Sequence, residues 1–130
     1  MISPVPDDRL HLIQPQHHRF PDIEKKVNAL LYKLGMQSAR FCIKISKAEV
    51  ITETGFDDVS FLFSGSKKGD LQEIGKIASG GELSRLMLSI KSIMATKKAL
   101  PTIIFDEIDT GVSGDVADKI GQILLRMSEK

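Results

Sequence analysis

Two short stretches of this chain carry residue types that could hold a phosphate and a metal ion. The first is Ser79-Gly80-Gly81-Glu82, which opens an amphipathic run. At the start of a helix the backbone N–H groups point outward, the helix dipole favours negative charge, and glycine lets an anion approach closely. The turn could therefore bind a phosphate. It could equally be a flexible helix cap, and the turn alone leaves both interpretations open.

The second stretch is the apolar run Thr102–Phe105, which ends in Asp106 and Glu107. A buried strand of an α/β fold delivers the residues at its carboxyl end to the edge where ligands bind. Asp106 could hold Mg²⁺, usually through water, because Mg²⁺ keeps much of its hydration shell. Glu107 could orient and deprotonate an attacking water. Two solvated acids at a strand end are the alternative.

Hydrophobic spacing predicts the elements of the first half of the chain. Pro21–Leu34 is expected to form a helix, because its apolar residues fall on one face and Gly35 suits its C-terminal end. Arg40–Ser46 alternates as a half-buried strand does, and Val59–Phe63 is a second strand candidate. The turn before that strand is assigned to Thr54-Gly55 and Asp57-Asp58, and the loop after it to Ser64–Asp70.

The second half is predicted to contain two helices and one strand. A helix begins at Ser79, with Glu82 completing a capping box, and Ser113 caps the last helix after a turn at Gly111–Gly114. The apolar stripes are Leu83, Leu86, Met87, Ile90, Ile93 and Met94 on one helix and Val116, Ile120, Ile123, Leu124 and Met127 on the other. Thr102–Phe105 is typical of a buried parallel strand. The predicted class is α/β, a partial sheet with flanking helices and an exposed edge.

Composition bounds the remaining possibilities. Residues 1–20 hold three prolines and all three histidines, which predicts an irregular N-terminal tail before a domain over residues 21–130. His17 and His18 are interpreted as solvated tail residues, since no partner stands at metal-ligand spacing. The net charge of +1 predicts no strong attraction to nucleic acid or membrane. Cys42 is the sole cysteine, which excludes an internal disulfide and is compatible with a reducing cytoplasm.

Taken together and in this order, the two stretches resemble the signature and Walker B motifs of ABC-type ATPases. The longer strings Ile77–Arg85 and Phe105–Gly114 look more specifically like the RecN family, bacterial SMC-like ATPases of DNA double-strand break repair. Leu34-Gly35-Met36 and Thr54-Gly55-Phe56-Asp57 are similar to that family as well. The resemblance covers Asp22–Lys130 and implies the C-terminal lobe of an ATPase head.

The resemblance implies an ATP site shared by two heads of a homodimer. Ser79, Gly80, Gly81 and Glu82 would face the γ-phosphate in trans, Asp106 would serve Mg²⁺, and Glu107 would be the general base in cis. The implied partners are a second head, a lobe that carries the P-loop, and DNA reached through the parent protein. The implied location is the bacterial cytoplasm at the nucleoid, with no membrane partner.

The resemblance also implies that Asp109 and Ser113 bound the D-loop, which contacts the partner head. Ser113 stands about where ABC ATPases usually have an aspartate. RecN-like proteins share this departure, so the role of Ser113 stays open. Pro21–Leu34 would be the end of a coiled-coil arm that re-enters the head. Its single apolar face suits an arm and ordinary packing on a sheet equally well.

A P-loop of the form Gly-x-x-x-x-Gly-Lys-Ser/Thr is missing from the sequence, because in Gly65–Gly69 the lysines precede the second glycine. We therefore expect the chain by itself to bind ATP weakly and not to turn it over. The leading hypothesis is part of a RecN-like head. The alternatives are a non-catalytic module or truncated product that docks onto intact heads, and another SMC-like or RecF-like ATPase. The turn Thr110–Gly114 favours RecN over the last of these.

Overall fold

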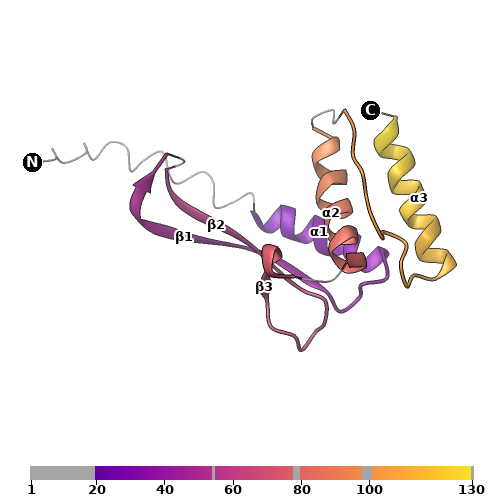
Figure 1. Cartoon of the computed structure of the whole chain (residues 1–130), viewed down its shortest axis with the longest axis horizontal. Coiled ribbons are helices and arrows are strands. Elements are labelled where there is room, and N and C mark those ends of the chain that lie inside the picture. Colours follow the sequence, from indigo (N-terminus) through magenta and orange to yellow (C-terminus); the bar gives the residue numbers. More distant parts are fainter. Residues whose placement is uncertain (1–19, 54, 78–79, 98–100, 130) are drawn as a thin grey trace, which may run out of the picture.

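A computed structural model of the chain describes residues 20–53, 55–77, 80–97 and 101–129. It contains helices and a three-stranded antiparallel sheet with the order β1-β2-β3 (Figure 1). The elements are α1 (Phe20–Lys33), β1 (Arg40–Thr52), β2 (Gly55–Ser64), β3 (Gln72–Glu73), α2 (Gly80–Ala95) and α3 (Gly114–Ser128), with a 3₁₀ turn at Ile74–Lys76. The predicted mixture of helix and sheet is confirmed. The predicted tail lies outside the described residues, except for Phe20, which already begins α1.

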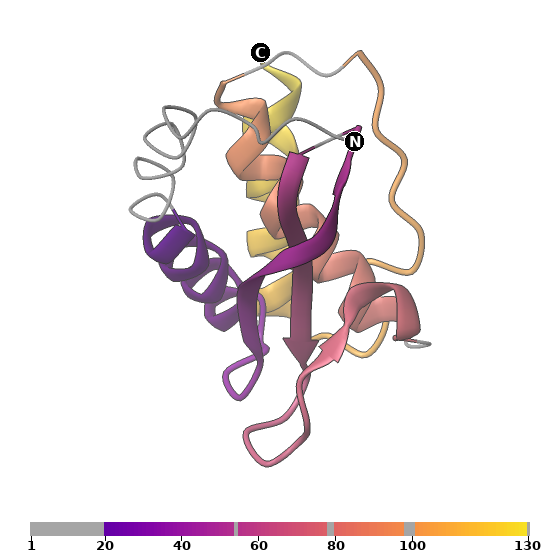
Figure 2. The same cartoon turned by 90° about the vertical axis from the view of Figure 1, so that its left-hand side faces the viewer.

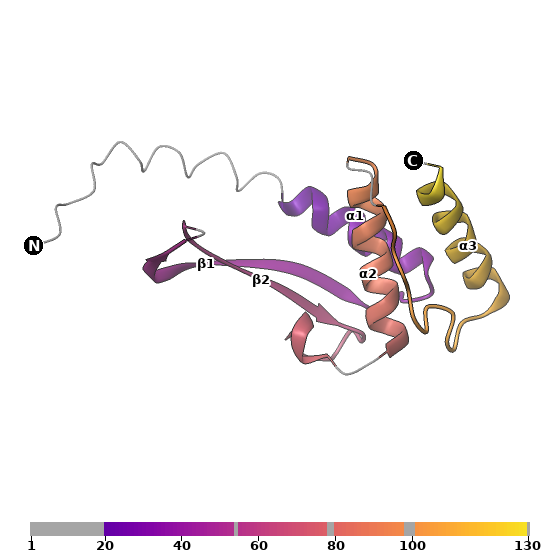
Figure 3. The ribbon, with the colours of Figure 1, turned by 45° about the horizontal axis from the view of Figure 1, so that its top comes forward.

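The long β1–β2 hairpin projects away from the three helices (Figures 1 and 3). Its pairing runs from Arg40 opposite Ser64 to Lys47 opposite Asp57, with a register shift beyond Lys47. Both strands are longer than predicted. Asp57 and Asp58 were expected in the turn, and that assignment is wrong, because they lie inside β2. Lys47 opposite Asp57 gives this pair a favourable charge match, which offsets the poor strand propensity of aspartate.

One face of the hairpin carries three consecutive apolar pairs and ends, at the far side from the helices, in the charged pair Lys47 and Asp57. Phe41, Ile43 and Ile45 of β1 lie opposite Phe63, Phe61 and Val59 of β2, as the alternating pattern predicts. The pair nearest the helices is buried, with Phe41 at 3% and Phe63 at 2% exposure. Farther out, Phe61 and Val59 are exposed, although the rings of Phe41 and Phe61 still stack at 6.0 Å. The helices therefore cover only the base of this face.

Helix α1 lies beside the outer edge of β1 and supplies hydrogen bonds that a further strand would otherwise make. Asn28 Nδ2 donates to the Phe41 carbonyl at 2.9 Å, and the Phe41 N–H donates to Asn28 Oδ1 at 2.8 Å. The next outward-pointing N–H, that of Ile43, donates to Glu24 Oε1 at 2.6 Å. These contacts pair the edge of β1 and fix α1 against the sheet.

Helix α2 lies between the hairpin and α3 (Figure 2), and its two sides belong to different core clusters. Leu86 packs with the buried residues of α1, β1 and β2. Leu88 packs with Leu34 and with Ile120 of α3. The predicted stripe of α2 omitted Leu88, which is fully buried, and included Met94, which is half exposed. A helix that is buried on two sides does not show a single apolar face.

The predicted strand Thr102–Phe105 is not formed among the described residues. Residues 101–113 run back along α2 (Figures 1 and 3), and Phe105 packs at the edge of the second core cluster. Ile104 is 89% exposed. The physical reason is that a strand needs neighbours for its backbone groups. The described strands form one sheet, whose strands β1 and β2 pack on the other core cluster, and this segment is not paired with it.

Candidate functional site

The two motifs meet where the amino end of α2 touches the turn after Phe105. Gly80 is the first residue of α2, and a Cβ built on it would overlap the carboxylate of Glu107. Glu107 has a φ of +52°, the left-handed conformation that non-glycine residues rarely adopt. This conformation directs its carboxylate toward the start of α2, where the helix dipole favours a negative charge. Ser79 lies outside the described residues.

Gly81 brings the backbone of the same turn against α2. A Cβ at Gly81 would lie 3.3 Å from the Glu107 carbonyl oxygen and 3.4 Å from the Thr110 carbonyl oxygen. One helical turn later, Arg85 Nη1 donates to the Thr110 carbonyl oxygen at 3.1 Å. A side chain at position 81 would be tight against the Glu107 carbonyl oxygen, so glycine favours this close approach of the turn to α2.

Three carboxylates in this turn face water. Asp106, Glu107 and Asp109 are all exposed. Within the described residues the structure holds no group of three or more His, Cys, Asp or Glu side chains that could enclose a metal ion. An exposed carboxylate fits Mg²⁺, which binds proteins through few direct ligands and retains water. The residues present therefore suit a hydrated ion whose remaining ligands come from water and from other groups.

Glu82 lies apart from these acids. Its carboxylate packs on the loop after β2, where a Cβ at Gly65 would lie 2.5 Å from Glu82 Oε2. The capping box predicted for Ser79 and Glu82 involves a residue outside those described. In the structure the Glu82 carboxylate lies against Gly65 of this loop.

The turn expected at Gly111–Gly114 begins earlier than predicted. The Thr110 N–H donates to the Glu107 carbonyl at 3.2 Å, and Gly111 has a φ of +69°. Ser113 stands at the N-cap position of α3, as predicted, but its hydroxyl makes no capping bond. The Ser113 carbonyl accepts the Ala117 N–H at 3.0 Å, so the backbone alone starts this helix.

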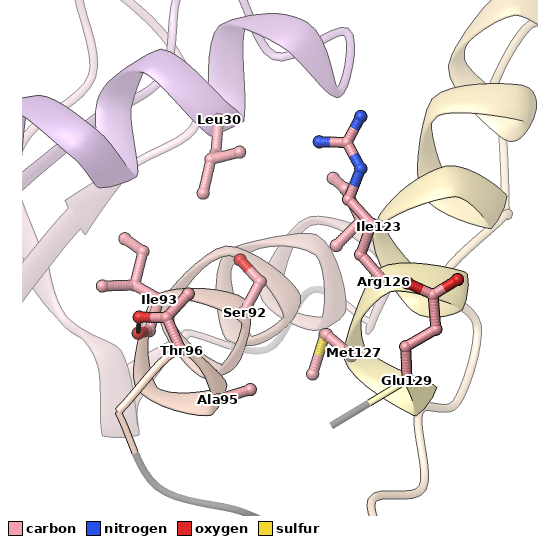
Figure 4. Close-up of a pocket in the computed structure, with 9 residues that line it drawn as sticks. All are labelled: Leu30, Ser92, Ile93, Ala95, Thr96, Ile123, Arg126, Met127 and Glu129. Carbon is pink, nitrogen blue, oxygen red and sulfur yellow. Dashed lines mark hydrogen bonds between the residues drawn. The ribbon is translucent and has the colours of Figure 1, made fainter.

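A cavity of about 360 Å³ lies at the opposite end of α2 (Figure 4). Leu30, Ile93, Ile123 and Met127 give it an apolar lining from all three helices, and Arg126 lies at its rim. None of the motif residues lines it. The cavity is therefore separate from the site at the amino end of α2.

Sequence reasoning missed Arg85. It ends the motif string Ile77–Arg85, but the motif assigns it no role. In the structure Arg85 is only 8% exposed. The available signal was its position four residues after Gly81, which places both on one side of α2.

Cys42 lies on β1 and is partly buried. Burial raises the pKa of its thiol above the ordinary value of 9.0, and the nearby Glu24 carboxylate raises it further, while Arg40 opposes the shift. The thiol is therefore protonated near neutral pH and a poor nucleophile.

In the described part of the chain, every helix is too short or too polar to cross a membrane.

Sequence comparison with known proteins finds several relatives that share one name. No family model matches the chain. It is 45% identical over 106 residues to DNA repair protein RecN of Rickettsia prowazekii, which covers 82% of this chain and 19% of that protein. RecN of Vibrio cholerae is 37% identical over 123 residues (94% of this chain, 22% of the relative), and RecN of Treponema pallidum is 40% identical over 110 residues (80% and 19%).

The chain thus spans about a fifth of the length of the curated relatives it matches. The matches extend over 80–94% of the chain. They confirm the resemblance that the motifs predict: the chain is similar to a segment of DNA repair protein RecN, consistent with its C-terminal part.

Proposed function

We propose that this chain is the part of a DNA-repair ATPase head that supplies the signature turn and the acids of a composite ATP site. The observation that carries the proposal is the meeting of Gly80 and Gly81 with Glu107 and Thr110 at the amino end of α2. Two motifs separated by more than twenty residues converge on one surface. A helix start with two glycines offers N–H groups to a phosphate, and the acids beside it suit phosphoryl-transfer chemistry.

Each of these residues has a separate task in the proposed mechanism. Gly80 and Gly81 offer their backbone to the γ-phosphate held by a partner head. Asp106 holds the water shell of Mg²⁺, and Glu107 takes a proton from the attacking water. Glu107 is exposed, so its carboxylate can leave the start of α2 and reach that water. Bound ATP would supply the phosphoryl group, and its Mg²⁺ would neutralise the charge that develops on it.

The proposal includes a missing lobe that carries the P-loop. The segment Thr102–Phe105 supports this partner, because Ile104 turns an apolar side chain into water at 89% exposure. Such a residue in an extended segment suits a strand whose neighbours belong to another part of the protein. The apolar outer face of the β1–β2 hairpin, including Val59 and Phe61, is a second surface without a cover in the described chain.

The test uses the full-length parent protein and measures ATP turnover. Glu107→Gln is expected to lower kcat by about 10²-fold or more, because it removes the general base, while ATP binding persists. Asp106→Asn is expected to lower turnover and to raise the Mg²⁺ concentration required. Asp118→Asn, an exposed acid on α3, is the matched control and should leave the rate unchanged.

Two results would contradict the proposal. One is Mg²⁺-dependent turnover by the 130-residue chain alone that Glu107→Gln abolishes, since this chain has no P-loop. The other is a parent whose turnover survives Glu107→Gln. A parent that binds intact heads but never hydrolyses ATP would favour the interaction module instead.

A further inference from the structure

Arg85 is a buried cation without a carboxylate partner in the described part of the chain. Its Nη1 donates to the Thr110 carbonyl at 3.1 Å, but its Nε is buried and has no hydrogen-bond partner among the residues that the structure describes. The ion pair that the structure records among the described residues, Lys76 with Glu73, is on the surface elsewhere. Buried guanidinium groups are ordinarily paired, because removing the charge from water is costly. Fold stability alone is therefore a poor explanation for arginine at this position.

The surroundings of Arg85 connect it to the acid-bearing turn. Gly81 and Arg85 lie one helical turn apart on the same side of α2, and both face the turn from Glu107 to Thr110. A Cβ at Gly81 would lie 3.4 Å from Arg85 Nη1. The same turn is closed by the Thr110 N–H, which donates to the Glu107 carbonyl. A displacement of α2 would therefore carry Glu107 with it.

We propose that Arg85 is a positioning residue that couples the signature turn to Glu107 of the same head. The proposal rests on the proposed function, in which Gly80 and Gly81 contact the nucleotide of the partner's site while Glu107 serves the head's own site. The charge-assisted bond from Arg85 to Thr110 transmits the position of α2 to the turn that carries the base. Binding of nucleotide in one composite site thus fixes the general base of the other.

The experiment measures kcat, KM and ATP-dependent head association in the full-length parent. Arg85→Gln removes the charge, Arg85→Met keeps much of the apolar volume, and Arg85→Lys keeps a single donor for the Thr110 carbonyl. Arg126→Gln, an exposed arginine on α3 outside the site, is the matched control. Association is measured in the Glu107→Gln background, where slow hydrolysis lets the ATP-bound heads accumulate.

Arg85→Gln and Arg85→Met are expected to lower kcat by about tenfold or more and to leave KM within about twofold, because positioning is lost and binding is kept. Head association should stay within about threefold of that of the Glu107→Gln parent. Arg85→Lys should recover part of kcat. A purely structural arginine would instead lower association and kcat together.

Three results would overturn the inference. Turnover of Arg85→Gln equal to that of Arg126→Gln would remove any role for the residue. Loss of association in parallel with kcat, in both Arg85→Gln and Arg85→Met, would assign Arg85 to folding. Absence of ATP turnover in the wild-type parent would overturn the proposed function and this inference together, whereas an active wild type with unchanged Arg85 variants would overturn only the inference.

Discussion

The Asn28 side chain is expected to be a main link between α1 and the hairpin, and its removal should weaken the fold measurably. Asn28→Ala deletes two hydrogen bonds to the Phe41 backbone, of 2.9 Å and 2.8 Å. Hydrogen bonds of this kind contribute about 1 kcal/mol each, so the loss is about 2 kcal/mol. Alanine recovers about 0.6 kcal/mol of helix propensity relative to asparagine.

The net destabilisation expected for Asn28→Ala is therefore about 1–2 kcal/mol, because Asn28 is only half-buried and water replaces part of the lost bonding. Asn28→Asp tests the two hydrogen bonds more selectively, because aspartate has nearly the same shape as asparagine. It keeps an acceptor for the Phe41 N–H but places a second oxygen against the Phe41 carbonyl. We expect a similar loss above the pKa of the new carboxyl, and a smaller one below it, where the protonated acid can donate.

The assay is urea unfolding of the 130-residue chain, with the free energy of unfolding extrapolated to water. Lys25→Ala, on the exposed face of the same helix, is the control and should stay within about 0.5 kcal/mol of wild type. If Asn28→Ala were as stable as Lys25→Ala, the two bonds to Phe41 would contribute nothing. The account of how α1 is held against β1 would then be refuted.

Three further predictions concern single positions. Gly35→Ala should destabilise the chain by about 1–3 kcal/mol in urea unfolding, because Gly35 has a φ of +80° and a Cβ there would lie 3.0 Å from Val116 Cγ2; an unchanged midpoint would refute it. The raised pKa of the Cys42 thiol means that the folded chain holds the proton more tightly than the unfolded chain. The stability that this difference contributes is fully present below the pKa of the unfolded chain and is lost as the pH rises through the pKa of the folded chain. Wild type should therefore lose stability relative to Cys42→Ala as the pH rises above 9.0, and a constant difference from about pH 7 to about pH 11 would contradict the shift. Ile104→Asp should change the stability of the 130-residue chain by less than about 0.5 kcal/mol, because the Ile104 side chain is 89% exposed there. The same substitution should lower the Tm of the parent protein, because it would bury a charge beneath the other lobe. A parent with an unchanged Tm would mean that no other lobe covers Ile104.

The helices could be predicted because their signals are local. Val27 and Leu31 have helical spacing, and both are fully buried in the structure. Gly35 was predicted to end α1, and its φ of +80° explains why glycine suits that position. The alternation that predicts β1 around Phe41 is also local, because it depends only on which face packs on the helices.

The errors arise where distant parts of the chain decide the structure. Asp57 looks like a turn residue until Lys47 is placed opposite it. Thr102–Phe105 has the composition of a buried strand, but a strand forms only beside another strand, and none of the described strands lies there. Its sequence is suited to a sheet that the described residues do not form around it, which is why composition alone predicts the wrong local structure.

The candidate site was predicted in part. The residue types of Gly80, Gly81, Asp106 and Glu107 pointed to one site, and in the structure the amino end of α2 does meet the turn that carries Glu107. The contact between Arg85 and Thr110 could not be predicted, because it depends on the path of the turn between α2 and α3. A buried cation is visible only once the packing around it is known.

The most direct test of the composite site mixes two inactive forms of the parent protein. One carries Glu107→Gln and the other Ser79→Arg, which places a bulky cation in the signature turn. If the signature acts in trans and Glu107 in cis, a mixed dimer has one intact site, and random pairing restores up to about one quarter of the wild-type rate. If both act within one head, every site in the mixture keeps a defect, so a mixture as inactive as its two components would contradict the account.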